Sequence, residues 1–343
     1  MPLFISNSST RAAHYLATVR WSVIWAVALS ILVLLLAFWE MFWRLNGFIP
    51  SITDDWPVWG SIRREVNADR AGTALVGASR VLVGVNPDAF VDMARGRAYM
   101  LAIDGSNPLP VLENLAADPG FRGRVICSIP PFWLAGSTLS RGDRAEKWLR
   151  KYENQSFASK IETRLTLSLQ ASLVFRYSGL APANIWEKWR KREKLRPPYA
   201  PMRIDRYRPA DYSKTDLEAL RMARVNRTRQ MHQETSPLDR NEFAARVQGI
   251  QEAVRRIHLR GGKVAFVRMP SCGQVKEIEE QTMPRHTYWD FFAGQVTAHT
   301  IHFEDYLELN RSKCTDGSHL NYDDAHYFSG QLLAILSEKG FFQ

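Results

Sequence analysis

The chain has 343 residues, of which 45% are hydrophobic and 23% are charged. This composition is typical of a globular protein and excludes a disordered chain, a collagen and a disulfide-rich miniprotein. The 45 Lys and Arg outnumber the 35 Asp and Glu, so the net charge is +10, which favours anionic partners. A mean hydropathy of -0.26 excludes a protein with many membrane spans but is compatible with a single span.

The first predicted element is an apolar helix near the N-terminus. Residues 21–39 carry no charge, and nineteen helical residues span roughly 28 Å, about the hydrocarbon thickness of a bilayer. Bulky residues follow where a signal peptide would have a small-residue cleavage site. We therefore expect an uncleaved transmembrane anchor over residues 21–43.

Charges on the two sides of this helix predict its orientation. Arg11 and Arg20 precede it without any acidic residue, whereas Asp54 and Asp55 follow it. Positive charge favours the cytoplasmic side, which predicts a cytoplasmic tail over 1–20 and a periplasmic or cell-surface location for the rest. This orientation argues against a nucleic-acid partner.

After an expected polar linker over residues 44–70, the chain alternates short apolar runs with segments of helical length. Nearly continuous aliphatic runs of this kind predict a parallel, doubly wound sheet covered on both faces, and thus an α/β fold. The amphipathic segment 241–262 and a last helix containing Phe328 and Leu332 support this prediction. The expected strands are 73–77, 99–103, 124–129, 263–268 and 299–303.

The basic stretch of the chain lies between the third and fourth expected strands. We expect residues 137–235 to form a largely helical insertion within a domain that extends over 71–343. Residues 141–230 hold 22 Lys and Arg against 10 Asp and Glu, a local charge of +12, so the remaining residues sum to -2. On an anchored protein this segment suits an anionic lipid surface, a cell-envelope glycan or the acidic rim of a partner protein. The alternative is an ordinary solvated helical face.

Ligands of doubly wound sheets gather at the carboxyl ends of the strands, so the residues that follow each strand are the candidates for chemistry. Here those residues include a serine, a glycine turn and an Asp-x-x-His motif. In chain order they are Ser79 and Arg80, then Gly105 and Asn107, then Trp133, and finally Asp316 and His319.

This order of motifs resembles the SGNH (GDSL-like) hydrolase superfamily. That family has a nucleophilic Ser in a G-x-S turn after the first strand, here Gly77 to Ser79, and a late D-x-x-H, here Asp316 to His319. The resemblance implies a three-layer sandwich. More narrowly, the anchor and motifs are similar to the D-alanyl transfer proteins of teichoic acid and to anchored, alginate-type O-acetylation proteins that work beside membrane-bound O-acyltransferases. The chain departs from the family after the third strand, where SIPPFW replaces the usual oxyanion-binding Asn.

The chemistry accounts for these residue types. A serine hydroxyl needs an imidazole to take its proton, and the imidazole needs a carboxylate to orient it. We therefore expect Ser79 to be the nucleophile, His319 the general base and Asp316 its orienting acid. The backbone N–H groups of Ser79 and Gly105, with the side chain of Asn107, are the expected oxyanion donors.

Each assignment has an alternative. Ser79 is otherwise a turn or N-cap residue. A second Asp-x-x-His match, Asp323 to His326, competes for the dyad, although its acidic residues suit the N-cap of the last helix. Arg80 is either an anion-binding residue or part of a structural salt bridge, and Trp133 is a possible substrate-binding residue.

The three cysteines form no zinc motif. Cys272 and Cys314 follow two strands at the same rim and could form a disulfide there, and Cys127 is expected in the core.

These observations predict a serine esterase or O-acyltransferase acting on acyl, most simply acetyl, esters of a cell-envelope carbohydrate polymer. No metal or other cofactor is expected, because no cluster has ligand spacing. The alternative is a non-catalytic assembly subunit of the same fold that docks on a membrane-bound O-acyltransferase.

Overall fold

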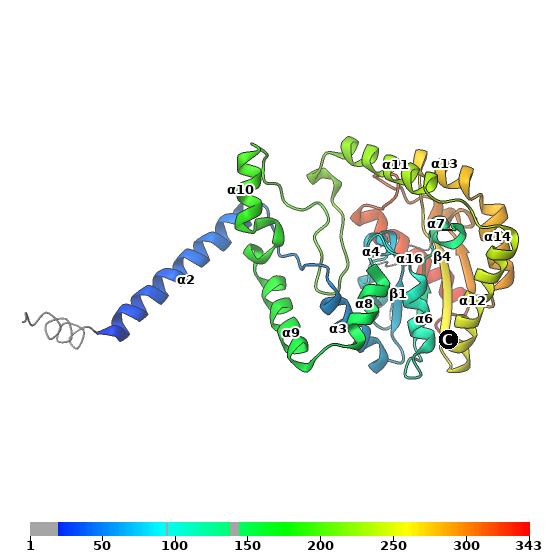
Figure 1. Ribbon diagram of the computed structural model, residues 1–343, viewed down its shortest axis with the longest axis horizontal. Coiled ribbons are helices and arrows are strands. Elements are labelled where there is room, and N and C mark those ends of the chain that lie inside the picture. Colours follow the sequence, from blue (N-terminus) through cyan, green and yellow to red (C-terminus); the bar gives the residue numbers. More distant parts are fainter. Residues whose placement is uncertain (1–19, 94, 138–143) are drawn as a thin grey trace, which may run out of the picture. The chain divides into compact units, whose positions relative to one another are not determined.

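The computed structural model describes residues 20–93, 95–137 and 144–343, and the chain divides into two units, Met1–Phe48 and Ile49–Gln343 (Figure 1). The first unit contains α2 (Trp21–Leu45). The most apolar stretch of this helix has a mean hydropathy of 2.5, and no residue of that stretch is buried. The helix ends before Gly47, which adopts the left-handed conformation with φ 80°. By length and composition, α2 is able to span a membrane, as predicted. The expected cytoplasmic tail falls mostly on residues 1–19, outside the described residues.

The second unit is an α/β structure around one parallel sheet. Its five strands have the order β2-β1-β3-β4-β5, and all four neighbouring pairs are parallel. The predicted parallel sheet is confirmed, with strands ending up to three residues earlier than the apolar runs. Their bounds are β1 (Thr73–Val76), β2 (Ala98–Met100), β3 (Arg124–Cys127), β4 (Lys263–Arg268) and β5 (His299–His302).

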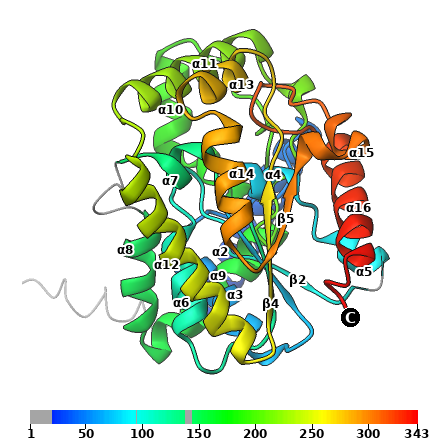
Figure 2. The same cartoon turned by 90° about the vertical axis from the view of Figure 1, so that its right-hand side faces the viewer.

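Helices cover both faces of this sheet. Successive strand residues point to opposite faces, so each strand contributes side chains to two separate core clusters. Val76 and Phe266 belong to one core cluster, and Leu75 and Val267 belong to the other. Figure 2 shows α12 and α16 on opposite sides of the strands. The first cluster packs against α3 (Trp56–Ala68), α6 (Leu109–Ala117), α12 (Arg240–Leu259) and α14 (Arg285–Gln295), and the second against α4 (Ser79–Gly84), α5 (Asp88–Asp92) and α16 (Tyr322–Glu338).

The expected linker over 44–70 is wrong for its second half, which forms α3. Asp55 caps this helix by accepting the N–H of Val58, and Pro57 occupies its first turn. Trp59 is fully buried, and its indole N–H donates to the carbonyl of Leu101 at 2.9 Å. Polar residues between the apolar positions of α3 concealed this packed face in the sequence.

The described residues between β3 and β4 contain several helices, but this segment also supplies core residues, so the insertion expected over 137–235 is not confirmed. Trp148 packs against Trp59 with ring centroids 6.4 Å apart, and the buried Arg206 donates to the carbonyl of Met100 and pairs with Asp54 at 2.6 Å. These contacts join the segment to the sheet. Its helices are α7 (Pro131–Ala135), α8 (Arg144–Glu153), α9 (Phe157–Ser172), α10 (Pro182–Arg190) and α11 (Leu217–Gln233), with 3-10 turns η1 (Val174–Arg176), η2 (Ser178–Leu180) and η3 (Tyr212–Lys214).

The remaining elements follow β4 and β5 in the chain. α13 (Gly273–Thr282) follows β4, and η4 (Phe303–Asp305) and α15 (Leu307–Asn310) follow β5. A loop over 311–321 then leads into α16, and this loop carries the Asp-x-x-His motif.

Candidate active site

The candidate site lies where the chain reverses its direction of winding. From β1 the chain passes to β2 on one side and then to β3 on the other, which opens a crevice at the carboxyl ends of these strands. Ser79 stands at this position as the first residue of α4. The N-cap of α4 is Ala78, so the N-cap alternative for Ser79 does not describe this structure.

The structure brings Ser79, His319 and Asp316 together. Nε2 of His319 lies 2.8 Å from Oγ of Ser79, and Nδ1 lies 2.9 Å from Oδ2 of Asp316. The other carboxylate oxygen of Asp316 accepts the backbone N–H groups of Ser318 at 2.9 Å and His319 at 2.7 Å. The three-residue spacing thus folds the acid onto the ring of its own histidine, and both side chains are oriented as a Ser-His-Asp relay requires.

Burial and charge set the protonation of this relay. Burial by itself would raise the pKa of Asp316, but the hydrogen bonds from His319 and the backbone, together with the positive charge of Arg224, hold that pKa well below its usual range. Burial lowers the pKa of His319, and this effect exceeds the opposing effect of Asp316. His319 is therefore neutral at pH 7, the state in which its Nε2 can accept a proton from Ser79.

The relay opens into a cavity of about 130 Å³. In the described part of the chain the backbone N–H groups of Ser79 and Gly105 have no hydrogen-bond acceptor, and both residues line the cavity. Gly105 adopts φ 62° and is exposed, with open space on the side where a Cβ would lie. Two unpaired N–H donors beside the serine could accept a developing oxyanion.

The other predicted site residues have mixed outcomes. Trp133 lines the cavity with Pro130 and Phe132, so this wall is apolar where the family pattern has an Asn. Asn107 is buried outside the cavity lining, and its Oδ1 accepts the N–H of Leu109, the first residue of α6, at 3.0 Å. The expected oxyanion role of its side chain is therefore not supported by the position of Asn107.

Arg80 forms the structural salt bridge that was one of its two interpretations. Its Nη2 lies 2.6 Å from Oε1 of Glu279, and both side chains are buried. Its Nε donates to Oγ of Ser318 at 3.2 Å, beside the relay. Arg80 therefore supports the loop of His319 and is not available as a free anion receptor.

The competing dyad is placed elsewhere. Asn321 is the N-cap of α16 and accepts the N–H of Asp324 at 2.7 Å, so the expected capping by Asp323 or Asp324 is wrong by a few residues. His326 contacts Asn86, with 3.3 Å between Nδ1 and Nδ2. The imidazole that contacts Ser79 is instead that of His319.

The sequence reasoning missed a wall of the cavity formed by α11. Arg224, Arg227, Thr228, Met231 and His232 face the cavity from this helix. Their spacing follows a helical period, but a search for apolar periodicity overlooks a mostly polar stripe. Nε of Arg224 donates to Oδ2 of Asp316 at 3.1 Å, so this arginine touches the relay itself.

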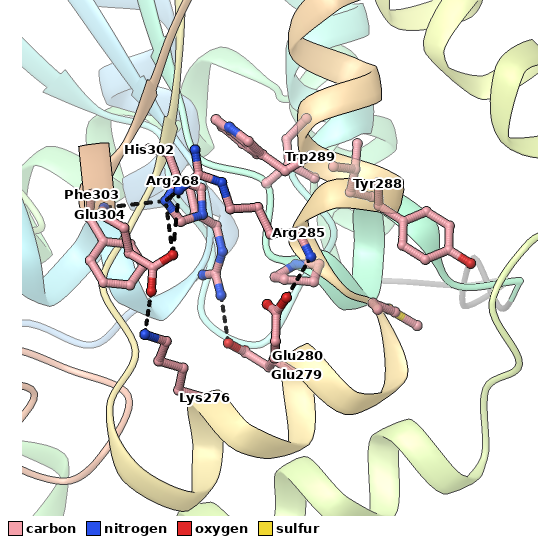
Figure 3. A pocket seen from close by; sticks show the side chains of 14 residues that line it. Arg268, Lys276, Glu279, Glu280, Arg285, Tyr288, Trp289, His302, Phe303 and Glu304 are labelled. Carbon is pink, nitrogen blue, oxygen red and sulfur yellow. Dashed lines mark hydrogen bonds and ion pairs between the residues drawn. The ribbon is translucent and has the colours of Figure 1, made fainter. Parts of the chain in front are cut away.

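A buried charge cluster behind the cavity was also missed. Glu279 pairs with Arg268 at 2.7 Å as well as with Arg80, and it accepts the hydroxyl of Ser271 at 2.8 Å. Burial alone would raise its pKa, but the two guanidinium groups lower the pKa of Glu279 to about 2. Figure 3 shows Arg268 pointing toward Glu279 from a second, small pocket that also contains His302 and Arg285. Nothing in the sequence pairs these residues.

The proposed disulfide partners are adjacent but unbonded. Cys272 and Cys314 are free thiols, and the backbone N–H of Cys314 donates to Sγ of Cys272 at 3.3 Å. Contact with the Cys314 thiol lowers the pKa of Cys272 to about 6. Cys127 is buried in β3, as expected.

Within residues 20–93, 95–137 and 144–343, no three His, Cys, Asp or Glu side chains converge as metal ligands would. Comparison of the chain with protein-family models and with curated proteins finds no match.

Proposed function

We propose that this protein is a serine esterase or O-acyltransferase of SGNH type. The observation that carries the proposal is the hydrogen-bonded series Ser79–His319–Asp316, which faces a cavity beside two free backbone N–H groups. The strand order, and the placement of the serine after β1 and the dyad before the last helix, agree with the SGNH three-layer sandwich.

The proposed reaction proceeds in two steps. Oγ of Ser79 attacks the acyl carbonyl carbon while its proton moves to Nε2 of His319, and the N–H groups of Ser79 and Gly105 stabilise the oxyanion. The alcohol leaves with that proton, and the acyl group stays on Ser79. Water or a sugar hydroxyl then attacks this ester while its proton moves to His319. His319 returns that proton to Oγ of Ser79 as the carboxylic acid or acylated sugar leaves.

We place this activity outside the cytoplasm, on acyl esters of a cell-envelope carbohydrate polymer, with acetyl as the simplest acyl group. The apolar helix α2 and the charge asymmetry around it support this placement. An anchored site near exported polymer gains effective concentration, which favours transfer between esters and glycan hydroxyls. A membrane-bound O-acyltransferase is the partner that would supply the acyl group.

The second candidate is a non-catalytic subunit of the same fold that docks on such an acyltransferase. The observation that favours it is the apolar wall of Pro130, Phe132 and Trp133, because the family's third oxyanion donor is missing there. Loss of one such donor typically lowers the rate about a hundred- to a thousandfold.

Turnover of a chromogenic acetyl ester tests the proposed function and its pH dependence together. Because burial lowers the pKa of His319, kcat/KM should stay constant down to the ordinary histidine pKa of about 6.5 and fall only at more acidic pH. Arg224 adds to this lowering, so Arg224→Met should move the acidic limb toward higher pH. Absence of turnover, or an acidic limb centred above the ordinary value, would contradict the assignment of His319 as base.

The cysteine pair tests the proposed location. In an oxidising compartment the adjacent thiols of Cys272 and Cys314 should be joined, which would fix the loop of Asp316 to the start of α13. When the unsubstituted protein is isolated from cells and denatured, alkylation should modify Cys127 alone without reductant. After reduction it should modify all three cysteines. In Cys314→Ser, Cys272 should become reactive without reductant. Three modified cysteines in unreduced native protein would argue against this location.

A further inference from the structure

An apolar stripe runs along the exposed side of α9. Its members are spaced four positions apart in the sequence, so they lie on one side of the helix. They extend over a length of about 18 Å. The buried residues of α9, Thr163, Leu167 and Gln170, lie on the opposite side. The stripe consists of Phe157, Ile161, Leu165 and Leu169, which are between 47% and 76% exposed.

A pair of exposed indoles follows on α10. Trp186 and Trp189 are 63% and 67% exposed, and their rings lie 4.9 Å apart. The chain then becomes basic, with six Lys or Arg and one Glu over residues 188–196. Exposed apolar groups bordered by a mostly basic stretch mark an interaction surface rather than an ordinary solvated face.

This surface is joined to the membrane helix by a short stretch of chain. Gln170 of α9 accepts the N–H of Thr53 at 3.0 Å, and the N–H of Ile52 donates to the carbonyl of Met202 at 3.0 Å. Only six residues of sequence separate Leu45, the end of α2, from Ile52. The C-terminal end of α9 is therefore bonded to the chain a few residues beyond the apolar helix.

We propose that the α9 stripe and the α10 indoles form a lipid-contact surface that lies on an anionic bilayer. Apolar side chains enter the boundary between headgroups and acyl chains, indoles prefer the headgroup level, and lysine and arginine attract anionic headgroups. Lipid is favoured over a protein partner because the surface combines three kinds of side chain that a bilayer accommodates. The apolar stripe suits the acyl-chain boundary, the paired indoles suit the headgroup level, and the basic residues of 188–196 suit anionic headgroups. Lipid contact by this surface does not require catalysis by Ser79.

Depth-dependent fluorescence quenching tests this surface in the full-length protein. A polarity-sensitive fluorophore is attached at Leu165→Cys, in a Cys272→Ser/Cys314→Ser background, and the protein is reconstituted in phosphatidylcholine vesicles with or without phosphatidylglycerol. Leu259→Cys is the matched control, because Leu259 is a 72% exposed leucine on α12. Quenching by spin-labelled lipid should be severalfold stronger at position 165 than at 259. It should increase with phosphatidylglycerol and weaken in high salt.

A second variant separates lipid contact by this surface from membrane attachment through α2. Ile161→Ser with Leu169→Ser should reduce quenching at position 165 toward the level of the control, while esterase turnover stays unchanged. Equal quenching at 165 and 259 in both lipid compositions would overturn the proposal. It would indicate that the stripe binds a protein partner instead of lipid. Quenching that ignores phosphatidylglycerol and salt would overturn the role of the basic residues.

Discussion

Replacement of Ser79 by alanine should lower turnover of a chromogenic acetyl ester by about a thousandfold or more, because the acyl group loses the oxygen to which it transfers. Covalent labelling by a fluorophosphonate should disappear in the same variant. The fold should be unaffected, since Ser79 is partly exposed and does not cap α4. Turnover and labelling of purified full-length protein measure both effects.

Ser318→Ala is the matched control for this change. Ser318 lines the same cavity and contacts Arg80, but the contact that holds Asp316 comes from its backbone N–H, which alanine retains. We expect this variant to keep most of the activity. Unchanged labelling of Ser79→Ala would exclude Ser79 as the nucleophile. Envelope acylation that survives Ser79→Ala in cells would favour the non-catalytic subunit.

Removal of the buried carboxylate by Glu279→Leu should destabilise the protein by about 3–5 kcal/mol, because two arginines would lose their partner inside the protein. Arg80 and Arg268 are each only 8% exposed and both pair with Glu279. The free energy of unfolding, measured by denaturant titration at neutral pH, should report this loss. Activity should fall as well, because Arg80 and Glu279 line the same cavity as Ser79 and His319.

Glu252→Leu provides the surface comparison. Glu252 also bonds two arginines, Arg255 and Arg256, but all three side chains are well exposed to solvent. Its loss should leave the unfolding midpoint nearly unchanged. Combining Glu279→Leu with Arg80→Met and Arg268→Met should recover much of the lost stability, because no unpaired charge remains. Equal stability of Glu279→Leu and the native protein would show that the cluster is solvated.

The sheet and the relay were predictable because both follow local rules. Short aliphatic runs such as 263–268 identify parallel strands, and the three-residue spacing of Asp316 and His319 places the acid and base in one loop. The strand order then brings the loop to Ser79, which is far away in sequence.

Contacts between distant polar residues were not predictable in this way. Arg224 of α11 meets Asp316 across 92 residues of sequence, and Glu279 of α13 meets Arg80 of α4 across 199 residues. No periodicity relates these partners, and a buried arginine reads in sequence like an exposed one. The same holds for α3, whose polar residues concealed a buried Trp59.

The packing of α3 has a practical consequence for producing a soluble form of this protein. A truncation placed after residue 70, at the end of the expected linker, would remove Trp59 and Val66 from the core, together with Arg63, whose guanidinium bonds Asn114 and Asp118. The α/β unit begins at Ile49. A secreted fragment starting there would keep these side chains and omit residues 1–48, which include the apolar helix.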